Sequence, residues 1–378
     1  MNLLTTRESW KAFKQKMLAD EAAMAQLKAR ADEYLKAPPL TVVDKTIPSP
    51  SEDPHDYFSF APYWWPDPSK KDGLPYIRRD GEVNPESLET DRAKIEQLID
   101  SVNVLTAYSV AADSAPHAEK AASVLHTWFL HHDTCMNPNL EYGQGIRGVC
   151  KGRGIGIIDT VGFVFILDAM LHLPSSVWPE ENDKGLKKWF SRYVDWLLNS
   201  EHGKKEAKEH NNHGTWYDAQ VIAFALYADR KDVAKKLIET TSLKRILSHI
   251  QPDGRQPHEL SRTLSMSYSC FNLLGHICII EMAKSVDIDI WHNDEEVTEK
   301  TGAAMQFLLP YLAGQTPWPY TQIKPYKPEV AMYLLSLASQ HSNTWIVPQL
   351  KALKPRPWNY VIYTANKDRV KSKENDEG

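Results

Sequence analysis

Most of the chain repeats one pattern, in which apolar side chains recur at helical spacing and Pro or Gly then interrupts them. The pattern predicts helices over residues 86–113, 116–132, 157–171, 179–200, 212–228, 230–240, 266–284, 294–312 and 328–340. Alternating Val, Ile and Thr is scarce, so any strands are expected to be short. Successive helices bury their apolar stripes against one another, which predicts an all-α fold of helical hairpins. Because no repeat of fixed period is visible, we expect an (α/α) toroid or incomplete barrel rather than an open solenoid.

The N-terminal part of the chain differs from the rest. Residues 7–36 read as one helix, which Pro38 and Pro39 would end. From about residue 40 to 85 the periodicity disappears, and the stretch is too long for an ordinary connection. Its many aromatic residues argue against a disordered linker, so we expect a long aromatic loop. We predict a single domain over residues 1–366 and a charged C-terminal tail over 367–378.

Composition limits the classes of partner. The chain has 378 residues, of which 42% are hydrophobic and 25% are charged, as in a soluble globular protein. Its 12 Trp, 16 Tyr and 10 Phe are typical of proteins whose aromatic surfaces stack on sugar rings. A net charge of −5 offers no general attraction to nucleic acid or to an anionic membrane. An acidic ligand therefore needs a local basic cluster, and no apolar run is long enough for a membrane helix.

The cysteines and the N-terminus leave two questions open. Cys135, Cys150, Cys270 and Cys278 show neither a CxxC motif nor a zinc-ligand spacing. The spacing allows a Cys135–Cys150 bridge without requiring it. The first residues lack a long apolar segment, so the protein is either cytoplasmic or an exported protein whose signal has been replaced by Met1.

Amides, imidazoles and aromatic rings crowd into residues 210–218, where the helix predicted over 212–228 begins. Asn211 or Asn212 would be its N-cap. His213 would lie in the first turn, beside the positive end of the helix dipole, where an anion is favoured. Taken alone, the stretch is better explained by a capping Asn and a hydrogen-bonded histidine.

A second group of candidates lies in the long loop. Tyr63, Trp64 and Trp65 are flanked by prolines and would form a stiff aromatic platform. Arg78 and Arg79 follow, and their forked donors suit carboxylates. The alternative is a Pro-rich loop that packs its tryptophans onto the helices.

A glycine-rich stretch over 142–160 contains Gln144 and Arg153. It lacks the Gly-Lys-Ser/Thr ending and the preceding strand of a phosphate-binding loop, so that interpretation fails. Gln144 and Arg153 remain as polar candidates, with a structural role as the alternative.

His258 and Glu259 resemble the start of a zinc-protease HExxH motif, but Arg262 stands where the second histidine is required. A cation there would repel zinc, so no metal site is predicted. Arg262 lies six residues before Tyr268, in a polar loop that leads into an apolar helix. On its own, Tyr268 would be an ordinary packed tyrosine.

Together these residue types suit β-elimination at a uronic acid. The proton at C5 is removed only if the adjacent carboxylate is neutralised, which Asn and His side chains can do. A base must take that proton, and an acid must protonate the leaving O4. A tyrosine can fill both roles if a cation lowers its pKa, and we expect Arg262 to do this for Tyr268.

Residues 60–85, the Asn211–His213 core and the Arg262…Tyr268 segment resemble the alginate lyases among the helical-toroid polysaccharide lyases, families five and thirty-eight. The resemblance covers roughly residues 55–340 and implies that Asn212 and His213 neutralise the uronate. It further implies that Arg262 supports Tyr268, which transfers the proton. The resemblance implies that Tyr63, Trp64, Trp65, Arg78 and Gln144 bind the substrate, and we predict the same role for Trp216. The Ser-rich segment 264–269 departs from family five and leaves the preferred uronate open.

The resemblance also implies a monomer that needs no cofactor and acts on an acidic polysaccharide, alginate, in the periplasm or outside the cell, after removal of an export signal. In mannuronate the C5 proton and O4 lie on the same side, so Tyr268 could act alone. In guluronate they lie on opposite sides, so His213 would be the base and Tyr268 the acid.

Three other functions remain open. The first is a lyase for another polyuronate, such as glucuronan. The second is a helical-toroid glycoside hydrolase, which needs two carboxylates that flank the sugar bond. Its candidates are Asp159, Asp218 and Glu259, and none of them sits in sequence surroundings that predict a raised pKa. The third is a sugar-binding protein without activity, which would leave Asn212, His213 and Tyr268 without a role.

Overall fold

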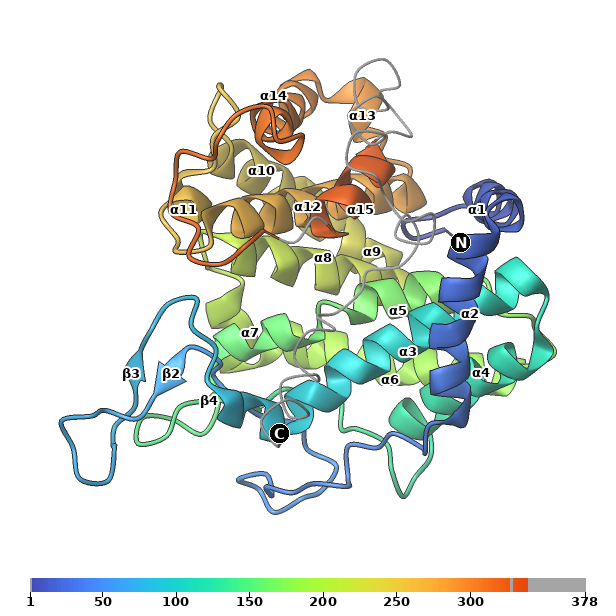
Figure 1. The fold of residues 1–378 in the computed structure, drawn as a ribbon, viewed down its shortest axis with the longest axis horizontal. Coiled ribbons are helices and arrows are strands. Elements are labelled where there is room, and N and C mark those ends of the chain that lie inside the picture. The colour runs from blue at the N-terminus through green and yellow to red at the C-terminus, as the bar shows by residue number, and fades with distance from the viewer. Residues whose placement is uncertain (1, 327–328, 339–378) are drawn as a thin grey trace.

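The computed structural model describes residues 2–326 and 329–338, and within them helices dominate (Figure 1). The α-helices are α1 (Arg7–Ala19), α2 (Glu21–Lys36), α3 (Asp91–Ala112), α4 (Ala115–Phe129), α5 (Phe163–Met170), α6 (Glu180–Asn199), α7 (Glu201–Glu206), α8 (Asn212–Tyr227), α9 (Lys231–Leu237), α10 (Leu243–His249), α11 (Pro257–Leu260), α12 (Ser265–Ala283), α13 (Ile290–Asn293), α14 (Glu295–Leu312) and α15 (Glu329–Ala338). Short 3₁₀ segments η1 (Pro85–Glu89), η2 (Gly154–Thr160) and η4 (Lys284–Val286) and the π segment η3 (Ile238–Ser242) connect or extend them. The strands are β1 (Phe58–Phe60), β2 (Trp64–Trp65), β3 (Ile77–Arg78) and β4 (Tyr142–Gly145). The all-α class with short strands is confirmed.

The helices divide into inner and outer ones. Inner helices α3, α8 and α12 are buried on nearly all sides, whereas α4, α6 and α14 bury one face and expose the other. Helix α3 packs against α4 and α5, α8 against α6 and α12, and α12 against α14 and α15. Figure 1 shows α12, α8 and α5 one below another in the middle of the molecule. This pairing of inner with outer helices follows from the apolar stripes, while closure into a toroid stays a prediction.

Helix α8 is the central element. Every residue from Asn212 to Tyr227 is buried except His213, which is partly open at the N-terminal end. A helix that is apolar on all sides has to be surrounded by other helices. Its N-terminus, with Asn212 and His213, is therefore held rigidly at the edge of the core.

The predicted helix over 7–36 is two helices. Asp20 ends α1 in a non-helical conformation, and its side chain accepts a bond from Ala23 N at the start of α2. Aspartate competes for backbone N–H groups in this way, and the apolar periodicity did not reveal it. The prediction of one continuous helix was wrong.

Two further boundaries differ. In place of the predicted 157–171 helix, the 3₁₀ segment η2 is followed by the short helix α5. In place of the predicted 230–240 helix, α9 ends at Leu237, and the π segment η3 connects it to α10, which was not predicted. Helix α15 begins at Glu329, but the end of the predicted 328–340 helix and the 367–378 tail lie outside the described residues.

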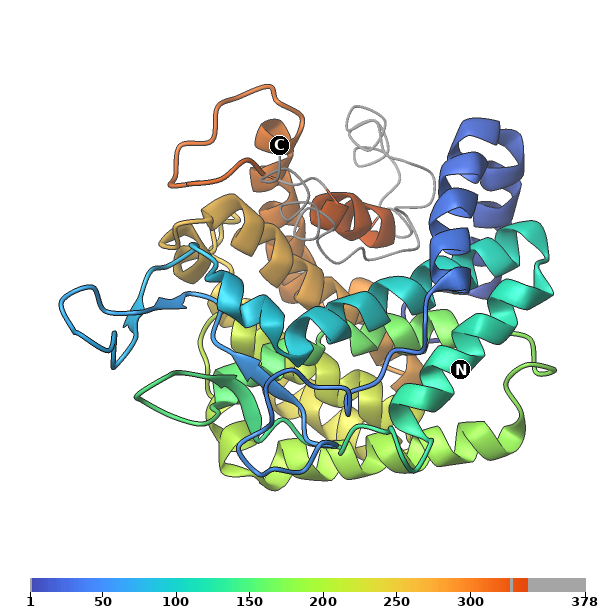
Figure 2. The same cartoon turned by 60° about the horizontal axis from the view of Figure 1, so that its bottom comes forward.

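The loop over residues 40–85 is ordered by short strands. Strand β1 pairs in parallel with β4, and β2 pairs in antiparallel fashion with β3, so that Trp64 lies opposite Arg78. The β2–β3 hairpin projects from the helical body (Figures 1 and 2). The prediction of a structured aromatic loop is confirmed.

No helix within residues 2–326 and 329–338 is both long and apolar enough to cross a membrane. All four cysteines are free thiols, so Cys135 and Cys150 do not form a bridge.

Candidate active site

The N-terminus of α8 carries the first part of the site. Asn211 is the N-cap, and its Oδ1 accepts a hydrogen bond of 2.9 Å from the His213 backbone N–H. Asn212 donates its backbone N–H (2.6 Å) and its Nδ2 (2.8 Å) to the two carboxylate oxygens of Glu259. The cap was expected at either Asn211 or Asn212, and the structure selects Asn211.

Glu206, at the end of α7, orients His213. Its Oε1 lies 2.7 Å from His213 Nδ1, and its side chain is 1% exposed. Burial raises the pKa of Glu206, and the neighbouring His213 offsets part of the rise. An ionised Glu206 accepts a hydrogen bond from the Nδ1–H group of His213. The other ring nitrogen, Nε2, then carries no proton and can act as a base. Glu206 was not among the predicted site residues.

Tyr268 lies between a cation and a second phenol. The guanidinium carbon of Arg262 is 3.9 Å from the centre of the Tyr268 ring, and the hydroxyl of Tyr63 is 2.8 Å from the Tyr268 hydroxyl. Burial raises the pKa of Tyr268 well above its ordinary value, Tyr63 adds to the rise, and Arg262 opposes it only in part. The expectation that Arg262 lowers this pKa is therefore wrong in the net, because burial dominates.

Asp80 holds Arg262 in place. Its two carboxylate oxygens accept bonds of 3.1 and 2.8 Å from Nε and a terminal nitrogen of Arg262. Thr263 and Arg78 also donate to Asp80, at 2.8 and 2.6 Å. Partial burial favours the neutral acid, but these donors, above all Arg262, hold the pKa of Asp80 well below its usual range. The guanidinium is thus held over the phenol ring.

Glu259 connects the two halves of the site. It binds Asn212 directly, and it also lies within the electrostatic influence of Arg262 and His213. Burial raises the pKa of Glu259, and the two bonds from Asn212 partly counteract the rise. Glu259 therefore links the start of α8 to the surroundings of Arg262, while the catalytic roles predicted for Asn212, His213, Arg262 and Tyr268 stay predictions.

Gln144 lies in a buried network beside this cluster. Its Nε2 donates to Asp159 at 2.8 Å, and its Oε1 accepts from Arg153 at 3.1 Å. Asp159 also accepts from Tyr57 and Ser59. Both ends of the Gln144 amide are thus bound to protein, and the guanidinium of Arg153 reaches 6.0 Å from the Trp64 ring centre.

The aromatic platform is partly open to solvent. Trp64 and Trp65 are half-buried, and the Trp65 indole donates to the Glu82 carbonyl at 3.0 Å. The side chain of Arg78 is 55% exposed and pairs with Asp80. These three residues can still contact a chain that lies along the hairpin.

Trp216 requires a correction. It is fully buried, stacks on Phe271 at 4.8 Å and donates its indole N–H to the Phe271 carbonyl at 3.0 Å. Because Trp216 points into the interface between α8 and α12, no face of its ring is left for a sugar. Its helical spacing was that of a core residue.

The carboxylates of the hydrolase alternative also differ from expectation. Burial raises the pKa values of Asp218 and Glu259, which the sequence surroundings did not predict. However, Asp218 is bound by Arg245 at 2.9 Å, and Glu259 is bound by Asn212. The third candidate, Asp159, is likewise held by protein, because it accepts hydrogen bonds from Tyr57, Ser59 and Gln144.

Within the described part of the chain, His131, His132 and Asp133 form a group whose potential ligand atoms lie within 4.8 Å of one another. All three residues are exposed, and none of them belongs to the predicted site.

The all-α fold matches that of helical alginate lyases of known structure. The sequence profile of the alginate lyase family matches residues 41–318, and the chain belongs to this family. It is therefore an enzyme that acts on polysaccharides, and the resemblance found in the sequence is confirmed.

Solved structures agree. An alginate lyase from Bacteroides ovatus is 37% identical, over 97% of this chain and 99% of that chain, with a TM-score of 0.87. Alginate lyase A1-III from Sphingomonas species A1 is 13% identical over 90% of this chain and 95% of that chain, with a TM-score of 0.51, and shows the common fold alone. No curated protein matches the chain.

Proposed function

We propose that this enzyme cleaves alginate by β-elimination, with Asn212 and His213 at the uronate carboxylate and Tyr268 as the proton donor to O4. The observation that carries the proposal is the pair of partly buried contacts that orient the two reactive groups. Glu206 holds His213 at 2.7 Å, and Tyr63 holds Tyr268 at 2.8 Å. Orientation by such contacts is a common requirement of acid–base catalysis.

The N-terminal turn of α8 neutralises the substrate carboxylate. The amide nitrogen of Asn212 carries two hydrogens, and Glu259 accepts one of them, so the second is left for the substrate. The positive end of the helix dipole acts at the same place. An enolate that forms when C5 loses its proton is stabilised by these donors.

Tyr268 is protonated in the resting site because burial raises its pKa. A neutral phenol can give its proton to O4 without first losing one, and His213 Nε2 is then the base that takes the C5 proton. This assignment suits guluronate, whose C5 proton and O4 lie on opposite sides. For mannuronate, Tyr268 acts alone: its hydroxyl first gives its proton to solvent, Arg262 stabilises the phenolate, and the phenolate takes the C5 proton and passes it to O4.

The hairpin supplies the remaining contacts. Trp64 and Trp65 offer aromatic surface to sugar rings, and Arg78 offers a guanidinium to a uronate at the rim. We further infer a periplasmic or secreted enzyme, because its polymeric substrate lies outside the cytoplasm.

The test is the ultraviolet absorbance of the unsaturated product on alginate, mannuronate blocks, guluronate blocks and glucuronan, with chondroitin as control. A rise on alginate supports the proposal, and the block preference shows which base acts. A rise on glucuronan alone keeps the chemistry and changes the substrate. Polymer shortening without absorbance would mean hydrolysis and would overturn the proposal.

A further inference from the structure

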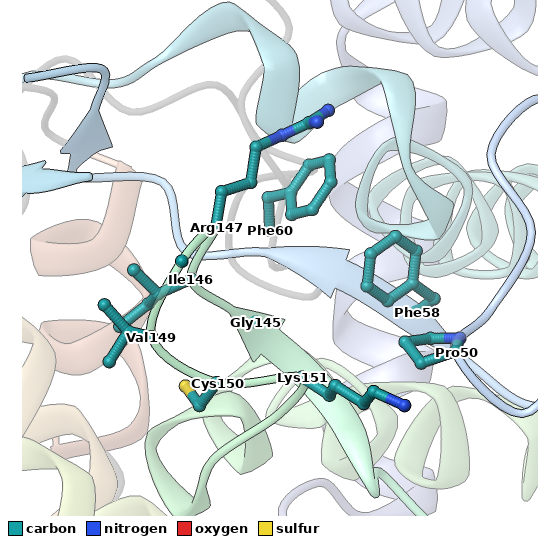
Figure 3. Close-up of a pocket in the computed structure, with 10 residues that line it drawn as sticks. Pro50, Phe58, Phe60, Gly145, Ile146, Arg147, Val149, Cys150 and Lys151 are labelled. Atoms are coloured by element: carbon teal, nitrogen blue, oxygen red, sulfur yellow. The ribbon is translucent and has the colours of Figure 1, made fainter. Parts of the chain in front are cut away.

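A pocket of about 380 Å³ lies on the β1–β4 strand pair (Figure 3), and its lining includes none of the four predicted catalytic residues. Strand β1 has two faces, because side chains alternate along a strand. Ser59 points to Asp159 and the Gln144 network, whereas Phe58 and Phe60 point the other way and line the pocket. The strand therefore separates the pocket from the Gln144 network.

The pocket combines an aromatic floor with positive charge. The Phe58 and Phe60 rings meet edge to face at 4.9 Å, and the guanidinium carbon of Arg147 lies 4.5 Å from the Phe60 ring centre. Figure 3 shows Arg147 beside Phe60 and Lys151 near Pro50. The described lining residues include these two cations and no carboxylate.

The two cations are held differently. Arg147 pairs with Glu86 at 3.3 Å, and Glu86 also accepts from the Tyr76 hydroxyl at 2.9 Å, so the guanidinium is fixed in direction. Lys151 is exposed and has no ion pair within residues 2–326 and 329–338. Aromatic rings with a guanidinium at one end of the pocket and an unpaired ammonium at the other suit a ligand that has flat apolar faces and repeated carboxylates.

We propose that this pocket is a second binding site for acidic sugar residues, separate from the reacting site. The CH face of one pyranose ring lies on Phe60 beside Arg147, and Lys151, at the other end of the pocket, meets the carboxylate of another residue of the same sugar chain. The inference rests on the proposed function, because a polyuronate is the ligand that this enzyme meets at high local concentration. Such a site would hold a long chain on the enzyme between cleavage events and add to its apparent affinity.

The test compares Lys151→Gln and Phe60→Leu with the parent enzyme on long alginate and on an alginate trisaccharide, which offers far fewer sugar residues than the polymer. Lys188→Gln is the matched control, because Lys188 is an exposed lysine of α6. For the polymer we expect KM to rise about threefold with Lys151→Gln, the effect of losing one exposed ion pair. We expect a rise of about tenfold with Phe60→Leu, as for the loss of an aromatic contact. On the trisaccharide, kcat/KM stays at the parent value for all variants.

Several results would overturn the inference. Polymer KM values equal to the parent's in both pocket variants would show that no sugar binds there. Equal losses on polymer and trisaccharide would show that the pocket acts through the reacting site. An inactive parent enzyme would instead contradict the proposed function itself, so the two failures are distinguishable. Phe60→Leu could disturb packing, but Lys151→Gln changes an exposed side chain and keeps the test decisive.

Discussion

The hydroxyl oxygens of Tyr63 and Tyr268 lie 2.8 Å apart, although 205 positions separate the two residues in the chain. One belongs to the projecting loop and the other to the first turns of α12. The contact joins the aromatic loop to the proton-transfer residue, so residues of the loop are expected to affect the chemical step as well as binding.

Tyr63→Phe removes this contact and keeps the ring. We expect kcat on alginate to fall about fivefold, as for the loss of one net hydrogen bond of roughly 1 kcal/mol. Product absorbance measures the effect. Tyr76→Phe is the control, because the Tyr76 hydroxyl donates to Glu86 in the same loop. Tyr268→Phe sets the inactive baseline, and a Tyr63→Phe enzyme as fast as the parent would show that the contact has no role in turnover.

Glu206→Gln tests the orientation of His213. A neutral amide can offer a donor to Nδ1, which permits the wrong tautomer, so we expect kcat to fall at least about tenfold with a smaller change in KM. Glu201→Gln, on the exposed side of the same helix α7, is expected to match the parent. A loss confined to KM or to thermal stability would mean that Glu206 only supports the fold.

Arg262→Lys and Arg78→Lys make the same change in two arginines that bind one carboxylate, Asp80. A lysine cannot pair with both oxygens and lie flat over a ring. We therefore expect kcat to fall about tenfold or more for Arg262→Lys and less than about twofold for Arg78→Lys. Similar kcat values for the two variants would remove Arg262 from the support of Tyr268.

The two tryptophans are expected to behave in opposite ways. Trp64→Ala raises KM for long alginate several-fold and leaves the free energy of unfolding unchanged, because Trp64 is only half-buried. Trp216→Ala costs about 3–5 kcal/mol of stability, as for a large aromatic side chain removed from a core. Urea unfolding and steady-state kinetics on both variants measure the difference. A stable Trp216→Ala enzyme with a raised KM would reverse our correction.

Stability is expected to fall in mild acid. Burial lowers the pKa of His249 to about 3, whereas an unfolded histidine titrates near about 6.5. Between these values the unfolded chain binds a proton that the native protein does not, so the free energy of unfolding decreases as pH falls below about 6.5. The contribution of His249 is at most about 1.4 kcal/mol per pH unit.

His249→Gln removes this contribution. Urea unfolding at pH 7.5 and pH 5.5 measures it, and the variant is expected to lose less stability between the two values than the parent. His276, whose pKa burial also lowers, remains in both proteins and cancels in the comparison. An unchanged pH dependence would mean that His249 is protonated in the native protein.

Local sequence determined much of what was predicted. Apolar spacing alone located α8, and the Asn residues before it located its cap, because periodicity and capping are properties of neighbours in the chain. The roles of Asn212, His213, Arg262 and Tyr268 were predicted from a resemblance in short motifs, and they stay predictions. The interruption at Asp20 was missed because it depends on one side chain in an otherwise helical pattern.

Contacts across the fold were decided by tertiary structure. Asp80 meets Arg262 across 182 positions, and no local pattern shows which loop faces which helix end. The same holds for burial, which sets the pKa of Tyr268 and places Trp216 in the core. Sequence periodicity determines that a helix has an apolar face, but only the packing of the other helices decides whether that face meets protein or substrate.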